Sequence, residues 1–424
     1  MGAMIAPTIR PMRSLAGAPH EATDAVASLR PFRVGEFGDH PAAPSPAHVQ
    51  AANQLILQLR QRLVREAGDV NGEAERSRQA PTPHNLQLLL TRKQSALNRI
   101  KGIERIWDYY LELFGQRQSR FADALLGMDR MANDCYQAIY TGLGTGRSIP
   151  SPAPFTYMET GFTPATYRRG IRLSRLGRNA NPFPIVKLPY HRLVNPWTLG
   201  AVHHEVSHNL QSDLGLWQEA PRRIVAQLTS SGIPPQVAQV WGRWHKETWA
   251  DLCGILLGGP GIVASLLDVL ARSTRSTQAF NPTGVHPTPY LRALIGTELL
   301  RRMGFEREAA DFTRLWMHAY PKPAQDRIPR ALSATFPDAH RQVVEIICYQ
   351  PYRQLGDKSL AEVFSFDRSH ERMTREAAQR MARGVDPGII PSRFLVGAAR
   401  HALDHRMAPP EQIARNFYQA LRQR

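Results

Sequence analysis

The spacing of apolar residues constrains the fold of this chain more than any other feature of its sequence. Over most of the 424 residues the apolar side chains recur at the interval that places them on one face of an α-helix. The pattern starts near Val49, covers residues 49–63, 86–107 and 120–140, and returns after Pro196 almost to the end. Prolines and glycines divide it into separate segments. The sequence therefore predicts a mainly helical protein.

A short region between Phe155 and Val194 has a different pattern. In residues 166–174 and 184–188 apolar and polar side chains come close to alternation, and Gly, Asn and Pro flank both stretches. Alternation is typical of a strand with one buried face. We therefore expect a small β-sheet within the mainly α chain, which is an α+β fold.

Changes in composition predict four regions. Residues 1–48 are rich in Pro and Ala, and we expect a flexible arm because such a composition does not assemble a packed core. Residues 49–145 form a predicted helical N-terminal region, which ends at glycines and prolines. Residues 146–325 form a predicted core that contains the sheet, and residues 326–424 form a helical C-terminal region.

The overall composition is that of a globular protein, with 42% hydrophobic and 21% charged residues, which excludes a wholly disordered or fibrous chain. The first residues contain no apolar run of signal-peptide length, and prolines and glycines break the most apolar stretch, residues 253–271. We therefore expect neither export nor a membrane span. The three cysteines are far apart, which favours a reducing compartment, and we expect a cytoplasmic protein.

The chain carries a formal net charge of +17. This charge suggests the hypothesis that the chain binds an acidic partner. Its densest positive stretch contains Tyr167 and five arginines: Arg168, Arg169, Arg172, Arg175 and Arg178. A groove for a nucleic acid backbone or an acidic peptide would use such residues. A solvated strand and loop explain them as well, and arginine outnumbers lysine along the whole chain, so nucleic acid binding is the less favoured hypothesis.

The residues with the clearest chemistry lie in segment 199–209. It contains the motif H-E-x-x-H at His204, Glu205 and His208. Residues four apart lie on one face of a helix, so both imidazoles can bind one metal ion while Glu205 reaches a metal-bound water. The motif predicts one Zn²⁺ per chain.

A catalytic zinc normally has three protein ligands, so a third one is required. The extended metzincin motif is excluded because positions 211 and 214 are Gln and Leu. Further along the chain, Glu247 and Asp251 are four residues apart on a predicted helix. We predict that Glu247 is the third ligand and that Asp251 accepts a hydrogen bond from a ligand histidine. Asp251 or His245 as the ligand stay open as alternatives, and this donor set also suits iron(II).

A third fragment, His286-Pro-Thr-Pro-Tyr-Leu-Arg292, completes a set of motifs. H-E-x-x-H, followed by E-x-x-x-D and then H-P-x-x-x-x-R, resembles the gluzincin zinc metallopeptidases, in particular the CaaX-protease and heat-shock-protease type. The resemblance covers about residues 184–303 and implies a zincin-like catalytic core and a peptide or protein substrate. The chain departs from the membrane members of that group because it lacks their hydrophobic spans.

The resemblance also implies catalytic roles for residues around the metal. Glu205 would act as the general base that takes a proton from the attacking water. His286 and Arg292 would face the substrate carbonyl and stabilise the oxyanion of the tetrahedral state.

Substrate-binding residues follow from the same resemblance. Gluzincins pair an extended peptide with a strand beside the active-site helix, so Val186 and Leu188 are expected to belong to that substrate-binding edge. Tyr290 is a weaker candidate for contact with the substrate.

Other residues near the motifs are expected to be structural. His203 points about 100° away from His204 on a helix, as a packing or surface histidine does. Cys253 and three tryptophans of the same predicted helix are expected in the core; these tryptophans are Trp241, Trp244 and Trp249.

A second pair of histidines four residues apart, His401 and His405, has Ala402 where a catalytic glutamate would stand. We interpret this pair as part of a solvated helix face.

The sequence thus favours a soluble zinc metallopeptidase. The alternative is a non-catalytic, zinc-stabilised protein that binds protein or nucleic acid through basic helical surfaces. Glu205 favours the enzyme, because a purely structural zinc site has no use for a carboxylate at that position.

Overall fold

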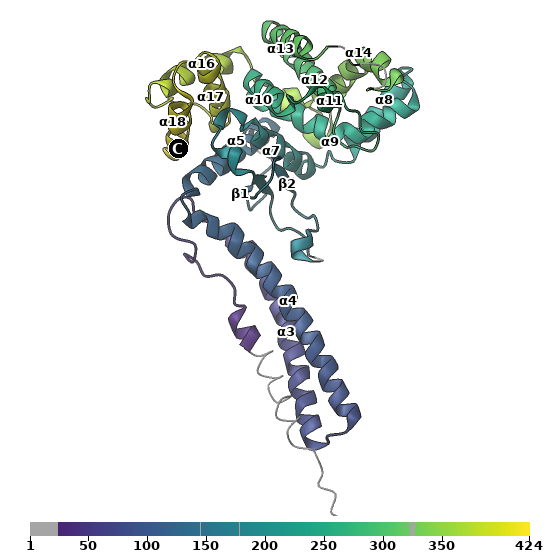
Figure 1. Ribbon diagram of the computed structural model, residues 1–424, viewed down its shortest axis with the longest axis vertical. Coiled ribbons are helices and arrows are strands. Elements are labelled where there is room, and N and C mark those ends of the chain that lie inside the picture. Colours follow the sequence, from purple (N-terminus) through teal and green to yellow (C-terminus); the bar gives the residue numbers. More distant parts are fainter. Residues whose placement is uncertain (1–23, 145, 178, 322, 324–326) are drawn as a thin grey trace, which may run out of the picture. The chain divides into compact units, whose positions relative to one another are not determined.

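The computed structural model describes residues 24–424 except 145, 178, 322 and 324–326, and Figure 1 shows its ribbon. The protein is mainly helical with one small mixed sheet, as the apolar spacing predicts. The chain divides into two compact units. The first contains the residues up to Arg120 together with Gly170–Pro182, and the second contains Phe121–Arg169 and Phe183–Arg424.

The first unit is built on two long helices that run side by side in opposite directions (Figure 1). α3 covers Pro46–Gln79 and α4 covers Pro83–Gly115. Each begins with a proline, whose missing N–H would have no partner in the first turn. Thr82 caps α4 by accepting a hydrogen bond from the Asn85 N–H at 3.2 Å. The predicted apolar face of α3 is buried, and that of α4 is buried at Ile100 and Ile103 but exposed at Leu90.

Part of the predicted arm belongs to the core of this unit. Residues 1–23 lie outside the described residues. Further along, Phe32 and Phe37 are buried, and their ring centroids lie 6.1 Å and 5.3 Å from that of Phe114. Phe32 also stacks on Trp107, at 5.4 Å. The expectation of a flexible arm does not hold for this stretch, because its aromatic rings supply the apolar surface that the Pro and Ala residues lack.

The sheet of the second unit has three strands in the order β1-β3-β2. β1 (Phe155–Met158) is parallel to β3 (Ile185–Leu188), and β2 (Ala165–Tyr167) is antiparallel to it. β3 is therefore the central strand. The strand predicted over residues 166–174 is shorter than expected, because the chain leaves the sheet after Tyr167.

Helices form the rest of the second unit (Figure 1). They are α5 (Ala122–Leu143), α6 (Tyr190–Leu193), α7 (Gly200–Asp213), α8 (Glu219–Ser230), α9 (Pro235–Gly258), α10 (Pro260–Leu270), α11 (Thr274–Thr277), α12 (Pro289–Arg302), α13 (Glu306–Ala319), α14 (Arg330–Val344), α15 (Leu360–Val363), α16 (Arg368–Ala382), α17 (Leu395–Asp404) and α18 (Pro410–Arg422). α9 lies in the core, as predicted: its residues Trp241, Trp244, Trp249 and Cys253 are fully buried.

The second unit does not follow the boundaries predicted at residues 145 and 325. α5 comes from the predicted N-terminal region, yet it packs against α7 and α18. α17 comes from the predicted C-terminal region, yet it packs against α10. One hydrophobic core includes side chains from all these helices, so the glycines and prolines of residues 142–154 mark a loop within a unit.

Within the part of the chain that the structure describes, no helix has the length and apolar character needed to cross a bilayer. The three cysteines, Cys135, Cys253 and Cys348, are buried free thiols.

Candidate metal centre

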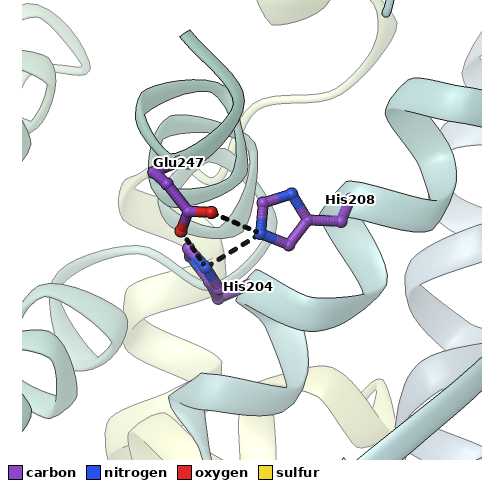
Figure 2. Close-up of side chains that lie close together, drawn as sticks. All are labelled: His204, His208 and Glu247. Atoms are coloured by element: carbon purple, nitrogen blue, oxygen red, sulfur yellow. Dashed lines mark hydrogen bonds and ion pairs between the residues drawn. The ribbon is translucent and has the colours of Figure 1, made fainter. Parts of the chain in front are cut away.

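α7 brings His204 and His208 together. They are four residues apart, so their side chains lie one above the other on one face of the helix. Their Nε2 atoms are 3.1 Å apart, and the two rings are nearly perpendicular, at 86°. Figure 2 shows both imidazoles pointing towards Glu247 of α9.

α9 supplies Glu247 because it packs closely on α7. At Gly254 a Cβ atom would lie 3.4 Å from His203 Cβ and 3.6 Å from the His204 nitrogen, which is ordinary contact distance, so the backbones of α9 and α7 lie close together here. Glu247 Oε2 is 3.2 Å from His204 Nε2, and Oε1 is 3.6 Å from His208 Nε2. The structure therefore brings together the three ligands that the sequence predicts.

One ligand atom from each of the three residues lies within 4.8 Å of the other two, so the group could hold a metal ion. Metal–ligand bonds of ~2.0–2.1 Å at tetrahedral angles place two ligand atoms roughly 3.3 Å apart. The two histidine Nε2 atoms are 3.1 Å apart, and each lies 3.2 or 3.6 Å from a different oxygen of Glu247. Lone pairs of two imidazoles and a carboxylate converge, and a cation between them would offset their repulsion. Among the described residues, this is the one group of His, Cys, Asp and Glu side chains close enough to hold a metal ion.

Asp251 lies one turn further along α9 and contacts the other nitrogen of His204. Its Oδ1 is 2.8 Å from His204 Nδ1. A carboxylate accepts the hydrogen bond, so Nδ1 carries the proton and Nε2 keeps its lone pair for the ligand group. This geometry argues against the alternative in which Asp251 replaces Glu247.

Arg292 of α12 binds both oxygens of Asp251, with Nη2 2.8 Å from Oδ1 and Nε bonded to Oδ2. Burial alone would raise the pKa of Asp251, but Arg292 and His204 lower it to about 2. The guanidinium is anchored on Asp251, where a bidentate pair fixes the carboxylate that orients His204. Arg292 also lines the cavity next to Glu205, and the oxyanion role that the resemblance implies for it stays a prediction.

Glu205 and His286 lie beside the ligand group. Glu205 is buried, and burial raises its pKa to about 7. A carboxyl group with such a value can both take up and release a proton near neutral pH. The side chain of His286 is 60% exposed, and its Nε2 is 3.1 Å from Glu247 Oε2. It thus contacts both solvent and a ligand carboxylate.

Three predicted substrate-binding residues do not lie at the site. Val186 and Leu188 are fully buried in β3, whose backbone pairs with strands on both sides. The prediction of an edge strand was wrong because β2 covers the expected edge. Tyr290 is also buried, and its carbonyl accepts a hydrogen bond from Trp316 Nε1 at 3.2 Å; it is not part of the cavity wall described next.

A cavity of about 110 Å³ adjoins the ligand group. Its wall at the metal end contains His204, Glu205, Asp251, His286 and Arg292. The remaining wall is almost wholly apolar and comes from α7, α9, α10 and the two residues before β2; it consists of Thr163, Pro164, Gly200, Ala201, Ala250, Gly254, Ile255, Ile262, Ser265, Leu266 and Val269. Sequence reasoning missed α10, whose apolar run was weighed only as a membrane span.

The other histidines near the motif are structural. His203 is fully buried, and its Nε2 donates to the Arg393 carbonyl at 2.9 Å, as expected of a packing histidine. Arg393 in turn pairs with Asp134 of α5, with its Nη1 2.9 Å from Oδ1. His245 donates from Nδ1 to the Gly242 carbonyl at 2.7 Å and lies outside the ligand group.

The pair His401 and His405 also lies outside the ligand group. The two ring centroids lie 4.0 Å apart, and the ring planes are tilted by 33°. His405 is exposed and His401 is half-buried. The prediction of a solvated helix face is therefore confirmed for His405 and only in part for His401.

The arginines of the basic stretch contact different partners. Arg168 lies over the ring of Trp217, at 3.5 Å. Arg169 donates to the carbonyl of Ser151 at 2.9 Å, and Arg175 pairs with Glu112 at 2.9 Å. Arg178 lies outside the described residues. These contacts give the nucleic acid hypothesis no additional support.

No family model, curated protein or solved structure matches this chain. The chemical interpretation of the site therefore depends on its own geometry and on the motifs.

Proposed function

We propose that this protein is a zinc-dependent metallopeptidase that hydrolyses peptide bonds, with a zincin-like core of the gluzincin type. One observation carries the proposal: Glu205, which is not itself a ligand, lines a cavity together with His204, a member of the three-residue ligand group. A structural zinc site is closed by four protein ligands, whereas a catalytic one has three and an open position.

Each residue of the site has a role in such a reaction. Zinc bound by His204, His208 and Glu247 would polarise the scissile carbonyl and lower the pKa of a bound water. Glu205 would take a proton from the attacking water on its carboxylate and pass it to the leaving amine. Asp251, held by Arg292, keeps the proton of His204 on Nδ1. His286 is exposed at the site and can donate to a substrate oxygen.

The substrate-binding strand of this proposal is β2. It is an edge strand of the sheet, and Thr166 Oγ1 accepts a hydrogen bond from Asn209 Nδ2 of α7 at 2.7 Å. Thr163 and Pro164, just before the strand, line the cavity. An extended peptide that adds to this edge would lie beside the ligand group.

Elemental analysis tests the metal site first. We expect about one zinc per chain in the wild-type protein and its loss in His204→Ala and Glu247→Ala. Zinc retained after Glu247→Ala would contradict the ligand set. Iron in the wild-type protein would show that the site binds iron and not zinc.

The Glu205→Gln variant tests the chemistry. It should keep zinc and fold but lose hydrolysis by roughly 10²–10⁴-fold, the usual contribution of a general base. Unchanged turnover would refute this role of Glu205. If zinc is bound and no peptide is cleaved, the non-catalytic alternative gains support, and a steep salt dependence of binding to DNA would identify its partner class.

A further inference from the structure

Two cations and one aromatic ring form a cluster on the side of the ligand group that faces away from the cavity. Arg168 follows β2, Trp217 lies in the turn between α7 and α8, and Lys246 belongs to α9. The guanidinium carbon of Arg168 is 3.5 Å from the centre of the Trp217 ring, and Lys246 Nζ is 4.4 Å from it. All three residues are half-buried. We call them the cationic cluster.

The cluster holds two like charges close together. The face of the indole ring attracts each cation, but the two cations repel each other. Lys246 forms no ion pair with any residue that the structure describes. The acid that offsets the repulsion at Lys246 is Glu247, and a metal ion bound to Glu247 would take up that negative charge. An external anion at the cluster would then offset the repulsion.

The cluster lies close to the ligand group. Lys246 directly precedes Glu247 in α9. Arg168 Nη1 is 3.4 Å from Ser212 Oγ of α7, and Ser212 follows His208 by one helical turn, which is about 6 Å along the helix axis. An anion bound to the cluster would therefore lie within a few residues' length of the metal.

β2 connects the cavity with the cationic cluster. Pro164 lines the cavity together with Gly200, at the start of α7. Thr166 bonds to Asn209 further along that helix, and Arg168 lies at its last turn. The edge strand thus runs beside α7 in the same direction, and its four residues after Pro164 span about 13 Å. A peptide that pairs with this edge would pass the ligand group and reach the cluster.

We propose that the cationic cluster binds a carboxylate of the substrate, so that the enzyme prefers peptides with Glu or Asp about two or three residues from the scissile bond. The inference rests on the proposed peptidase function and names the substrate class of the same site. Arginine and lysine form charge-assisted hydrogen bonds with carboxylates, and the net charge of +17 attracts acidic chains. The free edge of β2 favours a peptide over a nucleic acid, because strand addition needs backbone N–H and C=O groups.

The test uses an amidated peptide that the wild-type protein cleaves, in which Glu or its uncharged analogue Gln occupies each position in turn. Mass spectrometry locates the scissile bond. At a position about two or three residues from it, on one side only, Glu should raise kcat/KM over Gln by about ten-fold or more. Added NaCl should reduce this ratio because salt screens the charges. Glu no better than Gln at every position would overturn the inference.

Four variants assign the preference to the cluster. Lys246→Gln and Arg168→Gln should each lower the Glu-to-Gln ratio several-fold, whereas Lys246→Arg keeps the charge and should keep a preference for Glu. Arg222 of α8 is exposed and lies outside the cluster, so Arg222→Gln removes the same charge and should leave the ratio unchanged. Zinc content shows that each variant retains the site. A ratio that Lys246→Gln and Arg168→Gln leave unchanged would overturn the role of the cluster.

A second set of peptides identifies the source of the carboxylate. These peptides end at the preferred position with a free carboxylate or with an amide. A preference for internal Glu supports recognition of an acidic side chain. A preference for the free terminus alone would overturn that source and assign the cluster to the end of the peptide chain.

Binding to zinc-loaded Glu205→Gln, measured by calorimetry with the Glu and Gln peptides, separates the two proposals. Glu205-dependent cleavage with equal values for Glu and Gln would overturn the inference about the cluster and leave the peptidase. Tighter binding of the Glu peptide without any cleavage by the wild-type protein would overturn the peptidase and support the carboxylate site. Absence of both would refute both.

Discussion

His204 uses both of its ring nitrogens, and this decides which one can bind a metal. The Nδ1 atom donates to Asp251, and Arg292 holds that carboxylate from its other side. The orientation of the imidazole is therefore determined by two side chains that never touch the metal.

We expect Asp251→Asn and Arg292→Met to weaken zinc binding by about 10–100-fold, because either change loosens the orientation of His204. Competition with a chromophoric chelator measures the affinity. Asp311→Asn is the control, since Asp311 is exposed on α13 and pairs with Arg314. Affinity unchanged in Asp251→Asn and Arg292→Met would contradict the orienting role.

His401 makes stability depend on pH. Burial, and then the neighbouring His405, lower its pKa from 6.5 to about 4. Between these values the unfolded chain binds the proton and the folded protein does not, so stability falls as the pH decreases from 6.5 towards 4. His401→Gln should lose less stability over this interval than the wild-type protein. Urea unfolding at pH 7 and pH 5 gives the comparison, and equal losses would contradict the assignment.

At the level of helices, the site depends on how closely α9 approaches α7. Gly254 faces the α7 backbone at His203 and His204. Gly254→Ala adds a methyl group at ordinary contact distance and should retain zinc. Gly254→Leu should weaken zinc binding and cost about 1–3 kcal/mol of stability, as overpacking of a core does. Metal content after dialysis checks both variants, and equal zinc in the two would show that the separation of the helices does not matter.

The sequence predicted the helices and the ligand group because both depend on local spacing. Four-residue intervals place His204 near His208 and Glu247 near Asp251 on any α-helix. The central position of β3 was not predictable in this way, since strand order depends on contacts between distant segments. The same holds for the anchoring of Arg292 on Asp251 and for the α10 wall of the cavity.

At the level of the whole molecule, the two units have separate cores. Leu63 is fully buried in the first unit. Leu63→Ala should cost that unit about 2–5 kcal/mol and leave the zinc content unchanged. Hydrogen exchange followed by mass spectrometry should show faster exchange in α3 and α4 but not in α7 and α9. Loss of zinc in this variant would show that the units are coupled.

The hydrogen bond from His203 to Arg393 has a consequence for protein synthesis. His203 lies on α7 next to the ligand His204, and its acceptor is made 190 residues later. On the ribosome, α7 and α9 emerge well before the segment that satisfies this buried imidazole and links it to Asp134. We therefore expect the proposed hydrolytic activity to appear only when translation has passed residue 393.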